Sequence, residues 1–129
     1  MNNPLVPLSW GELIDKITIL DIKARRLQDE AALRNVQTEL QALRAIAFPP
    51  EADERLLAEL TQELARVNEQ LWDIEDAIRL REAKADFGPA FVELARAVYK
   101  TNDERSRIKR RINVALSSAL VEEKSYQPY

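Results

Sequence analysis

The chain has 129 residues, a formal net charge of −3, and neither cysteine nor histidine. It can therefore form no disulfide, no zinc site of the usual kind, no thiol nucleophile and no imidazole general base. A charge this close to zero gives no global attraction to nucleic acid. Only two glycines and six prolines interrupt the chain, and no proline lies inside a long periodic stretch, so most of the sequence is free to be helical.

The start of the first predicted helix has a specific capping signal. Two early prolines disfavour helix in residues 1–8, which we expect to be an extended lead-in. Ser9 is the expected N-cap, because Glu12 follows three residues later and completes a capping box. The helix should therefore begin at Trp10.

This first segment extends to about residue 47, where Phe48 and two prolines end it. Its apolar residues recur at steps of three and four, which is typical of one helical face. The phase slips after Ala31 and resumes at Val36, and Asp29 could cap a fresh helix. The sequence therefore allows a kink or a break near residues 29–33.

Two further helices are predicted over residues 51–86 and 89–120. An unbroken heptad pattern of leucine, valine and isoleucine runs through the second segment. Gly88 can act as its C-cap, and Pro89 can occupy the first turn of the third helix. The final residues, 122–129, lose the pattern and should form an irregular tail.

Three segments of about 35 residues joined by short turns predict an antiparallel, up-down-up bundle of three long helices. The fold class is thus all-α, with residues 1–129 forming a single domain. Folding about the turn at residues 49–50 places residue 68 near residue 30, and folding about the turn at 87–89 places residue 105 near residue 69. No apolar run approaches the ~20 residues of a membrane span, and the N-terminus lacks the features of a signal peptide, so we expect a cytoplasmic protein.

A layer of polar residues is predicted near the middle of this bundle. Arg105 occupies a core position of the third helix and needs a carboxylate partner, for which Glu30, Glu69 and Glu75 are the candidates. One interpretation is a structural layer that fixes helix register. The other is a pocket in which Arg105 holds an anionic ligand. The residues of this candidate layer or ligand site are Asn68, Trp72, Glu75, Arg79, Thr101, Asn102 and Arg105.

Residues 100–111 are the most basic stretch, with six cations against two acids, a composition that suggests a nucleic-acid surface. No aromatic residues interleave with these cations, as single-strand binding would require. The facing helix should supply acids at similar heights, so we expect a neutralised, solvated face. Those acids are Glu59, Glu63, Glu69 and Asp73.

Four strings resemble a family of small bacterial helical proteins that has no assigned activity. They are SWGELIDKITIL at residues 9–20, LWDIEDAIR at 71–79, VYKTND at 98–103 and EEKSY at 122–126. The resemblance implies a bacterial source and supplies no mechanism, substrate or cofactor. A weaker likeness, to the all-helical chorismate mutases, rests on residues 13–17 followed by Arg25 or Arg26. That family needs several interior cations, whereas only Arg105 lies on a seam here, with Lys16 and Arg79 beside one.

The sequence identifies no catalytic residue and no metal ligand, and it implies no cofactor. We expect a non-catalytic protein–protein interaction or assembly module. The alternatives are a small-molecule or enzyme site around Arg105 and, as a lesser alternative, nucleic-acid binding through residues 100–111. We also expect a homodimer, because Leu56, Leu80 and Leu116 lie off the main apolar stripe and form a second apolar surface.

Overall fold

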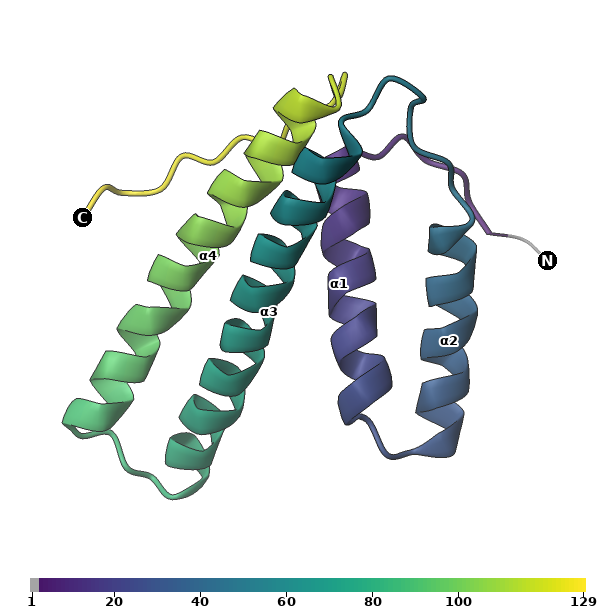
Figure 1. Cartoon of the computed structure of the whole chain (residues 1–129). Helices are drawn as coiled ribbons and strands as arrows, with labels where there is room; N and C mark the ends of the chain where they lie inside the picture. Colours follow the sequence, from purple (N-terminus) through teal and green to yellow (C-terminus); the bar gives the residue numbers. More distant parts are fainter. Residues whose placement is uncertain (1–2) are drawn as a thin grey trace.

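The computed structural model describes residues 3–129, which fold into four α-helices (Figure 1). They are α1 (Trp10–Arg26), α2 (Glu30–Arg44), α3 (Glu54–Ala83) and α4 (Pro89–Ala115). The all-α content follows the prediction, but the three-helix bundle is wrong. The lead-in predicted for residues 1–8 is exposed and non-helical over residues 3–8, and its first two residues lie outside the described part of the chain.

The segment predicted as the first helix forms two helices, because the helical conformation is interrupted within residues 27–29. Leu27 and Asp29 both adopt extended backbone conformations, which ends α1. Asp29 then caps α2, its carboxylate accepting a hydrogen bond from the Ala32 amide at 2.8 Å. The chain reverses there, so α2 folds back beside α1 instead of continuing along the bundle (Figure 1).

The N-cap of α1 is confirmed. Ser9 Oγ accepts a hydrogen bond from the Glu12 amide at 3.1 Å, and the helix begins at Trp10. The Glu12 carboxylate is directed elsewhere and pairs with Lys109 of α4. Ser9 therefore satisfies a first-turn amide of α1, while the Glu12 side chain ties this helix to α4.

The α3–α4 hairpin closes differently from the prediction at one position. Asp53 caps α3, and Lys84 is its C-cap. Gly88 was predicted to end this helix, but it is the N-cap of α4 with a φ of −75°. The left-handed conformation is adopted by Ala85, with a φ of 52°. Pro89 occupies the first turn of α4, as predicted.

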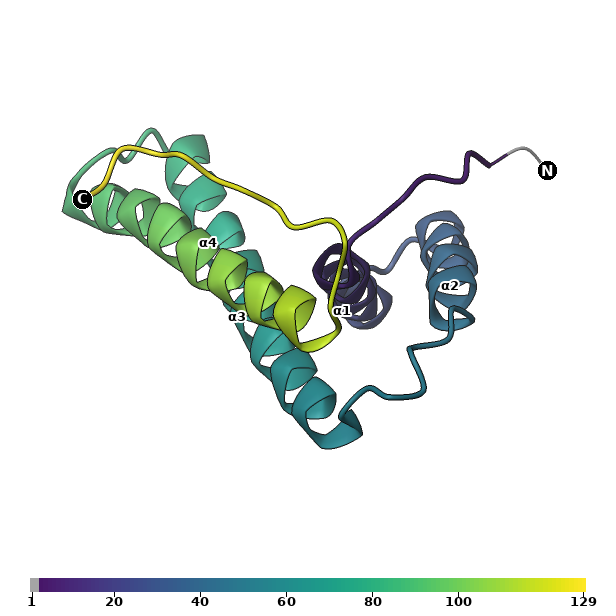
Figure 2. The ribbon, with the colours of Figure 1, turned by 90° about the horizontal axis from the view of Figure 1, so that it is seen from above.

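Helix α1 is the centre of the packing, because it contacts all three other helices. It runs parallel to α3 and antiparallel to α4, at the end of the hairpin where α3 begins (Figures 1 and 2). Among the four helices of residues 3–129, α2 packs against α1 alone. The main core lies between α1, α3 and α4, and a smaller one lies between α1 and α2. The main core consists of Ile14, Leu60, Leu64, Val67, Leu71, Ile108, Ile112 and Leu116.

The other half of the α3–α4 hairpin extends past the end of α1 (Figure 1). Within residues 72–107, all of which the structure describes, no residue is buried. We call this part the distal hairpin. Its helices contact one another, and α1 reaches it at Asp73 and Arg105, which pair with Arg26 and Asp15. The tail lies against Tyr99 and Asp103. No residue of this part is buried even so, and its apolar stripe is only half-buried. The molecule thus combines a packed half with an unpacked half.

The C-terminal tail, residues 121–129, runs back along α4 (Figure 2). Glu122 pairs with Lys109 at 2.9 Å, and the Tyr129 hydroxyl donates a hydrogen bond to Asp103 at 2.5 Å. The Tyr129 ring also meets the Tyr99 ring edge-on, with centroids 5.0 Å apart. Among the helices formed by residues 3–129, none has an apolar stretch sufficient to cross a membrane.

The capping geometry predicts that Ser9→Ala destabilises the protein. Removing the hydroxyl leaves a first-turn amide of α1 without its acceptor, which should cost about 1 kcal/mol. Chemical unfolding followed by circular dichroism measures the change. Ser125→Ala, in the exposed tail, is the matched control and should leave the free energy of unfolding unchanged. Identical unfolding midpoints for Ser9→Ala and the control would show that the cap contributes nothing.

Candidate functional site: a buried polar network beside an open trough

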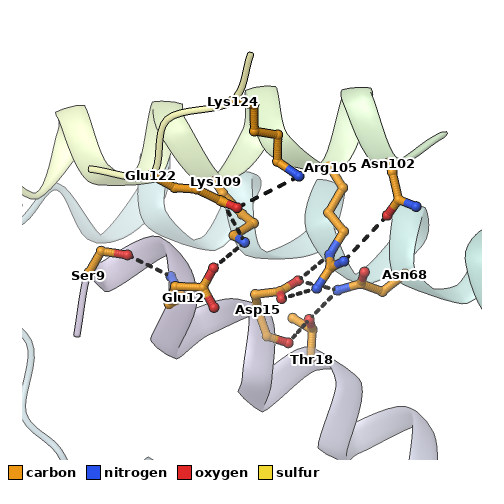
Figure 3. A network of polar contacts seen from close by, with 10 residues as sticks. All are labelled: Ser9, Glu12, Asp15, Thr18, Asn68, Asn102, Arg105, Lys109, Glu122 and Lys124. Carbon is orange, nitrogen blue, oxygen red and sulfur yellow. Dashed lines mark hydrogen bonds and ion pairs between the residues drawn. The ribbon is translucent and has the colours of Figure 1, made fainter. Parts of the chain in front are cut away.

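Asp15 is the centre of a buried polar network (Figure 3). Its side chain is 3% exposed and lies on the face of α1 that packs against α3 and α4. Asn68 of α3 donates hydrogen bonds from its amide nitrogen to Asp15 Oδ1 and to Thr18 Oγ1, each at 2.9 Å. The Thr18 hydroxyl in turn donates to the Asp15 backbone carbonyl at 2.8 Å. The carboxylate is therefore fixed from its own helix and from α3.

Arg105 of α4 completes the coordination of this carboxylate. Its Nε donates to Asp15 Oδ1 at 2.9 Å, and its Nη2 pairs with Oδ2, so the contact is bidentate. The guanidinium side chain is 28% exposed, against 3% for its partner. The hydrogen bonds that Arg105 donates to Asp15 raise the pKa of Arg105 more than burial lowers it, so the group stays charged. The remaining Nη1 lies 3.4 Å from Asn102 Oδ1.

The acids predicted to pair with Arg105 do not do so. Glu69 binds Arg25 and Arg26 of α1, Glu75 pairs with Arg79 one turn along α3, and Glu30 lies in the first turn of α2. The prediction failed because it assumed one continuous first helix antiparallel to the second. With α1 short and parallel to α3, residue 68 lies beside residues 15 and 18 and not beside residue 30.

Lys109 forms a second buried ionic contact one turn from Arg105. Its side chain is 7% exposed and pairs with Glu12 of α1 and with Glu122 of the tail, the latter at 2.9 Å. Burial acts to lower the pKa of Lys109, but the hydrogen bonds that its ammonium donates to the two glutamates together raise it by more. The same contact lowers the pKa of Glu122. Three segments that are remote in sequence are thus joined at one ammonium group.

The backbones of α1 and α4 approach closely at Gly11. The Gly11 amide donates to Asn113 Oδ1 at 2.7 Å, and a Cβ on Gly11 would lie 2.6 Å from the Lys109 carbonyl oxygen. The neighbouring Trp10 amide donates to Ser118 Oγ at 2.9 Å, just after α4 ends. Glycine is required here because any side chain would separate the two helices.

An open trough of about 510 Å³ lies beside the network, between one side of α1 and the α3–α4 hairpin. Six of the seven predicted site residues line it, and Thr101 does not. Trp72 forms part of its wall, with the Arg26 guanidinium 5.7 Å from the ring centroid. The lining residues are Ile19, Asn68, Leu71, Trp72, Glu75, Asp76, Arg79, Asn102 and Arg105.

Several residues of the network were not identified from the sequence, namely Asp15, Thr18, Lys109 and Asn113. A signal existed in α1, where buried Gly11, Asp15, Thr18 and Ile22 recur at helical spacing beside the main apolar stripe. This second stripe exists because α1 packs against other helices on two sides. A polar residue on it must face the core, which could have marked Asp15 as the partner of an interior arginine.

The basic stretch at residues 100–111 is extensively ion-paired. Acids of α1 and the tail neutralise three of its cations, and only Glu63 of the four acids expected on the facing helix pairs with it. The other three pair elsewhere, with arginines 25, 26 and 55. The pairs made by its cations are Arg105–Asp15, Lys109–Glu12, Lys109–Glu122, Arg110–Glu123 and Arg111–Glu63, and Glu104 of the stretch pairs with Arg66.

The chain belongs to a family of unknown function, DUF6165, whose model matches residues 5–129. The match confirms the resemblance to an uncharacterised family that the four sequence strings indicated. No curated protein and no solved structure matches the sequence. Family membership covers nearly the whole chain and carries no activity, so any function has to be argued from the geometry.

The close approach at Gly11 predicts that Gly11→Ala destabilises the protein although alanine is the better helix former. The new Cβ must displace the Lys109 carbonyl or the Asn113 side chain, which should cost about 1–3 kcal/mol, as overpacking usually does. Gly88→Ala is the steric control, because its Cβ meets only Asp86 Oδ1 at 3.4 Å, and any loss there reflects the poorer capping of α4 by alanine. Urea unfolding compares the two. A Gly11→Ala protein as stable as wild type would mean that α1 and α4 are not in this register.

Asp15 is more deeply buried than Arg105, so removing one partner of the pair should change the free energy of unfolding more than removing the other. Arg105→Ala leaves a carboxylate buried without its countercharge and should cost about 3 kcal/mol or more. Asp15→Asn should cost less, because the Arg105 side chain is partly exposed and can turn to water. Unfolding free energies measured near neutral pH decide this. If Arg105→Ala melts at or above the wild-type temperature, the pair is not a structural contact.

Proposed function

We propose that this protein is a non-catalytic assembly module that forms a reversible homodimer through its distal hairpin. The observation that supports this is the absence of any buried residue within residues 72–107, all of which the structure describes. A helix that is amphipathic but unpacked gains little stability, because helices in proteins are held mainly by burial of their apolar face. A partner that covers the hairpin would supply that burial.

The distal hairpin carries the apolar groups that such a partner would need. Ile78, Phe91 and Val98 are half-buried between or beside the two helices, and Leu80 and Phe87 are largely exposed. Two hairpins packed face to face would form an antiparallel four-helix bundle, in which each apolar stripe becomes core. In this arrangement the partner would bury the apolar stripe of the distal hairpin, as α1 buries that of the packed half.

The charge distribution favours a second copy as the partner. The distal part of α3 with its turn, residues 72–86, has more acids than bases. Residues 89–107 of α4 have only one more base than acids, and one of those bases, Arg105, is already paired with Asp15. A two-fold axis can place α3 of one copy beside α4 of the other, so that opposite charges meet in both halves of the interface. A surface that is complementary to itself in this way is what a symmetric dimer requires.

The size of the surface supports a weak dimer. Twelve residues of α3 rise roughly 18 Å at about 1.5 Å each, and two helices side by side are roughly 20 Å wide. Two such faces bury on the order of 800 Å² in total, which is below the roughly 1,200 Å² of small stable complexes. Association should therefore depend on concentration.

The apolar surface first expected from the sequence was mostly misplaced. Leu116 is buried in the main core and Leu56 packs against it, because the packed end of the hairpin receives α1. Only Leu80 of the three expected leucines is largely exposed, at 54%. The proposal of self-association therefore rests on the distal hairpin and not on that set.

Analytical ultracentrifugation tests the proposal. The wild type should sediment as a 14.8 kDa monomer when dilute and approach twice that mass as its concentration rises. Val98→Lys should remain monomeric at every concentration, because a charged side chain would enter the new core. A far-ultraviolet circular dichroism spectrum like that of the wild type shows that the variant is still helical.

Val114→Lys is the matched control. It makes the same substitution in the same helix, at a residue that is 71% exposed and lies outside the distal hairpin. This variant should dimerise as the wild type does. Equal loss of dimer in both variants, or a wild type that stays at 14.8 kDa at the highest attainable concentration, would overturn the proposal.

A further inference from the structure

We infer that the trough beside α1 is a binding site for a small organic acid, whose carboxylate is held by Arg105 and whose flat apolar body lies against Trp72. This inference stands apart from the proposed dimer, because it rests on the geometry of the buried network. Arg105 reaches the trough with its orientation already fixed, and three helices contribute to the lining.

One edge of the Arg105 guanidinium is hydrogen-bonded to Asp15, and another edge can still donate to a ligand. A guanidinium carries five N–H donors in a rigid, planar fork. Asp15 accepts from Nε and Nη2 on the buried side, whereas Nη1 has only the long contact of 3.4 Å with Asn102 (Figure 3). The edge formed by Nη1 and Nη2 therefore retains donors, and it matches the spacing of carboxylate oxygens.

Asp15 acts as a positioning residue for this arginine. It holds the guanidinium from behind, and Asn68 and Thr18 hold Asp15 in turn. A ligand would thus meet a side chain whose rotational freedom is already largely lost, which reduces the entropic cost of binding. Because Asp15 balances the charge of Arg105, recognition would depend on directional hydrogen bonds more than on net charge. Affinity should accordingly be modest.

The rest of the trough suits the body of such a molecule. Its volume of about 510 Å³ lies within the range of small-molecule sites. Ile19, Leu71 and Trp72 provide an apolar wall, and the Asn102 amide lies next to the free edge of the guanidinium. Glu75 and Asp76 also line the trough, and Glu75 pairs with Arg79 on the rim at 3.3 Å. A few polar groups beside an apolar wall are the usual composition of a ligand site.

Nuclear magnetic resonance with indole-3-acetate as the probe tests the site. The chain has only two tryptophans, so the indole N–H signals of Trp72 and Trp10 report on the trough and on a distant control position in the same spectrum. The probe should shift the Trp72 indole and the Asn102 side-chain amide, and leave Trp10 unmoved. Indole-3-acetamide, which lacks the carboxylate, should bind at least roughly tenfold more weakly. Spectra are recorded at a protein concentration where a single species sediments.

Two arginine variants separate recognition from folding. Arg105→Lys keeps a cation beside Asp15 but removes the planar fork, and should weaken binding of indole-3-acetate roughly tenfold. Arg110→Lys makes the same change at the exposed partner of Glu123, outside the trough, and should bind as the wild type does. The inference is overturned if no Trp72 shift occurs up to about 10 mM probe, if the acetamide binds equally well, or if both variants lose binding alike.

Discussion

The contact between Asp15 and Arg105 determines how the packed half of the molecule is arranged. A carboxylate that is 3% exposed cannot be left without hydrogen bonds, so the helices must meet where Arg105 and Asn68 both reach it. That single requirement fixes the position of α1 along both α3 and α4. Gly11 allows the close approach that follows, and Lys109 adds a second ionic contact one turn away. A thin apolar core could slide by one turn at little cost, whereas this polar network cannot.

The helix break within residues 27–29 has consequences for the whole architecture. Because α1 ends at Arg26, it covers only part of the α3–α4 groove, and α2 turns back on α1 instead of filling the remainder. The groove therefore has a covered part with a core and an uncovered part without one (Figure 1). The trough begins beside α1, and the distal hairpin continues from it. Both proposals thus follow from the length of one helix.

Local features were predictable from the sequence, and long-range register was not. Ser9 and Asp29 each begin a helix by accepting a hydrogen bond from the amide three residues later, so their roles can be recognised from spacing alone. The partner of Arg105 depends on which helices are neighbours and in which direction they run, and that changed once the first helix divided in two. Asn68 and Arg105 were nevertheless expected at one level, because the α3–α4 hairpin itself was predicted correctly. Asp15 was missed because a charged residue beside an apolar stripe normally faces water.

The two proposed sites share a boundary at Trp72, which lines the trough and begins the distal hairpin. A dimer partner that covers the hairpin would change the surroundings of the trough. A ligand in the trough would in turn change the surface that the partner contacts near Trp72. Thermodynamic linkage then requires that an organic acid alters the dimerisation constant by the same factor as dimerisation alters the affinity for the acid. The sign depends on whether Arg79 and Trp72 contact the ligand or the partner more strongly. A buried network that holds Arg105 rigid would transmit little motion itself, so any coupling has to pass through this shared surface and not through the core.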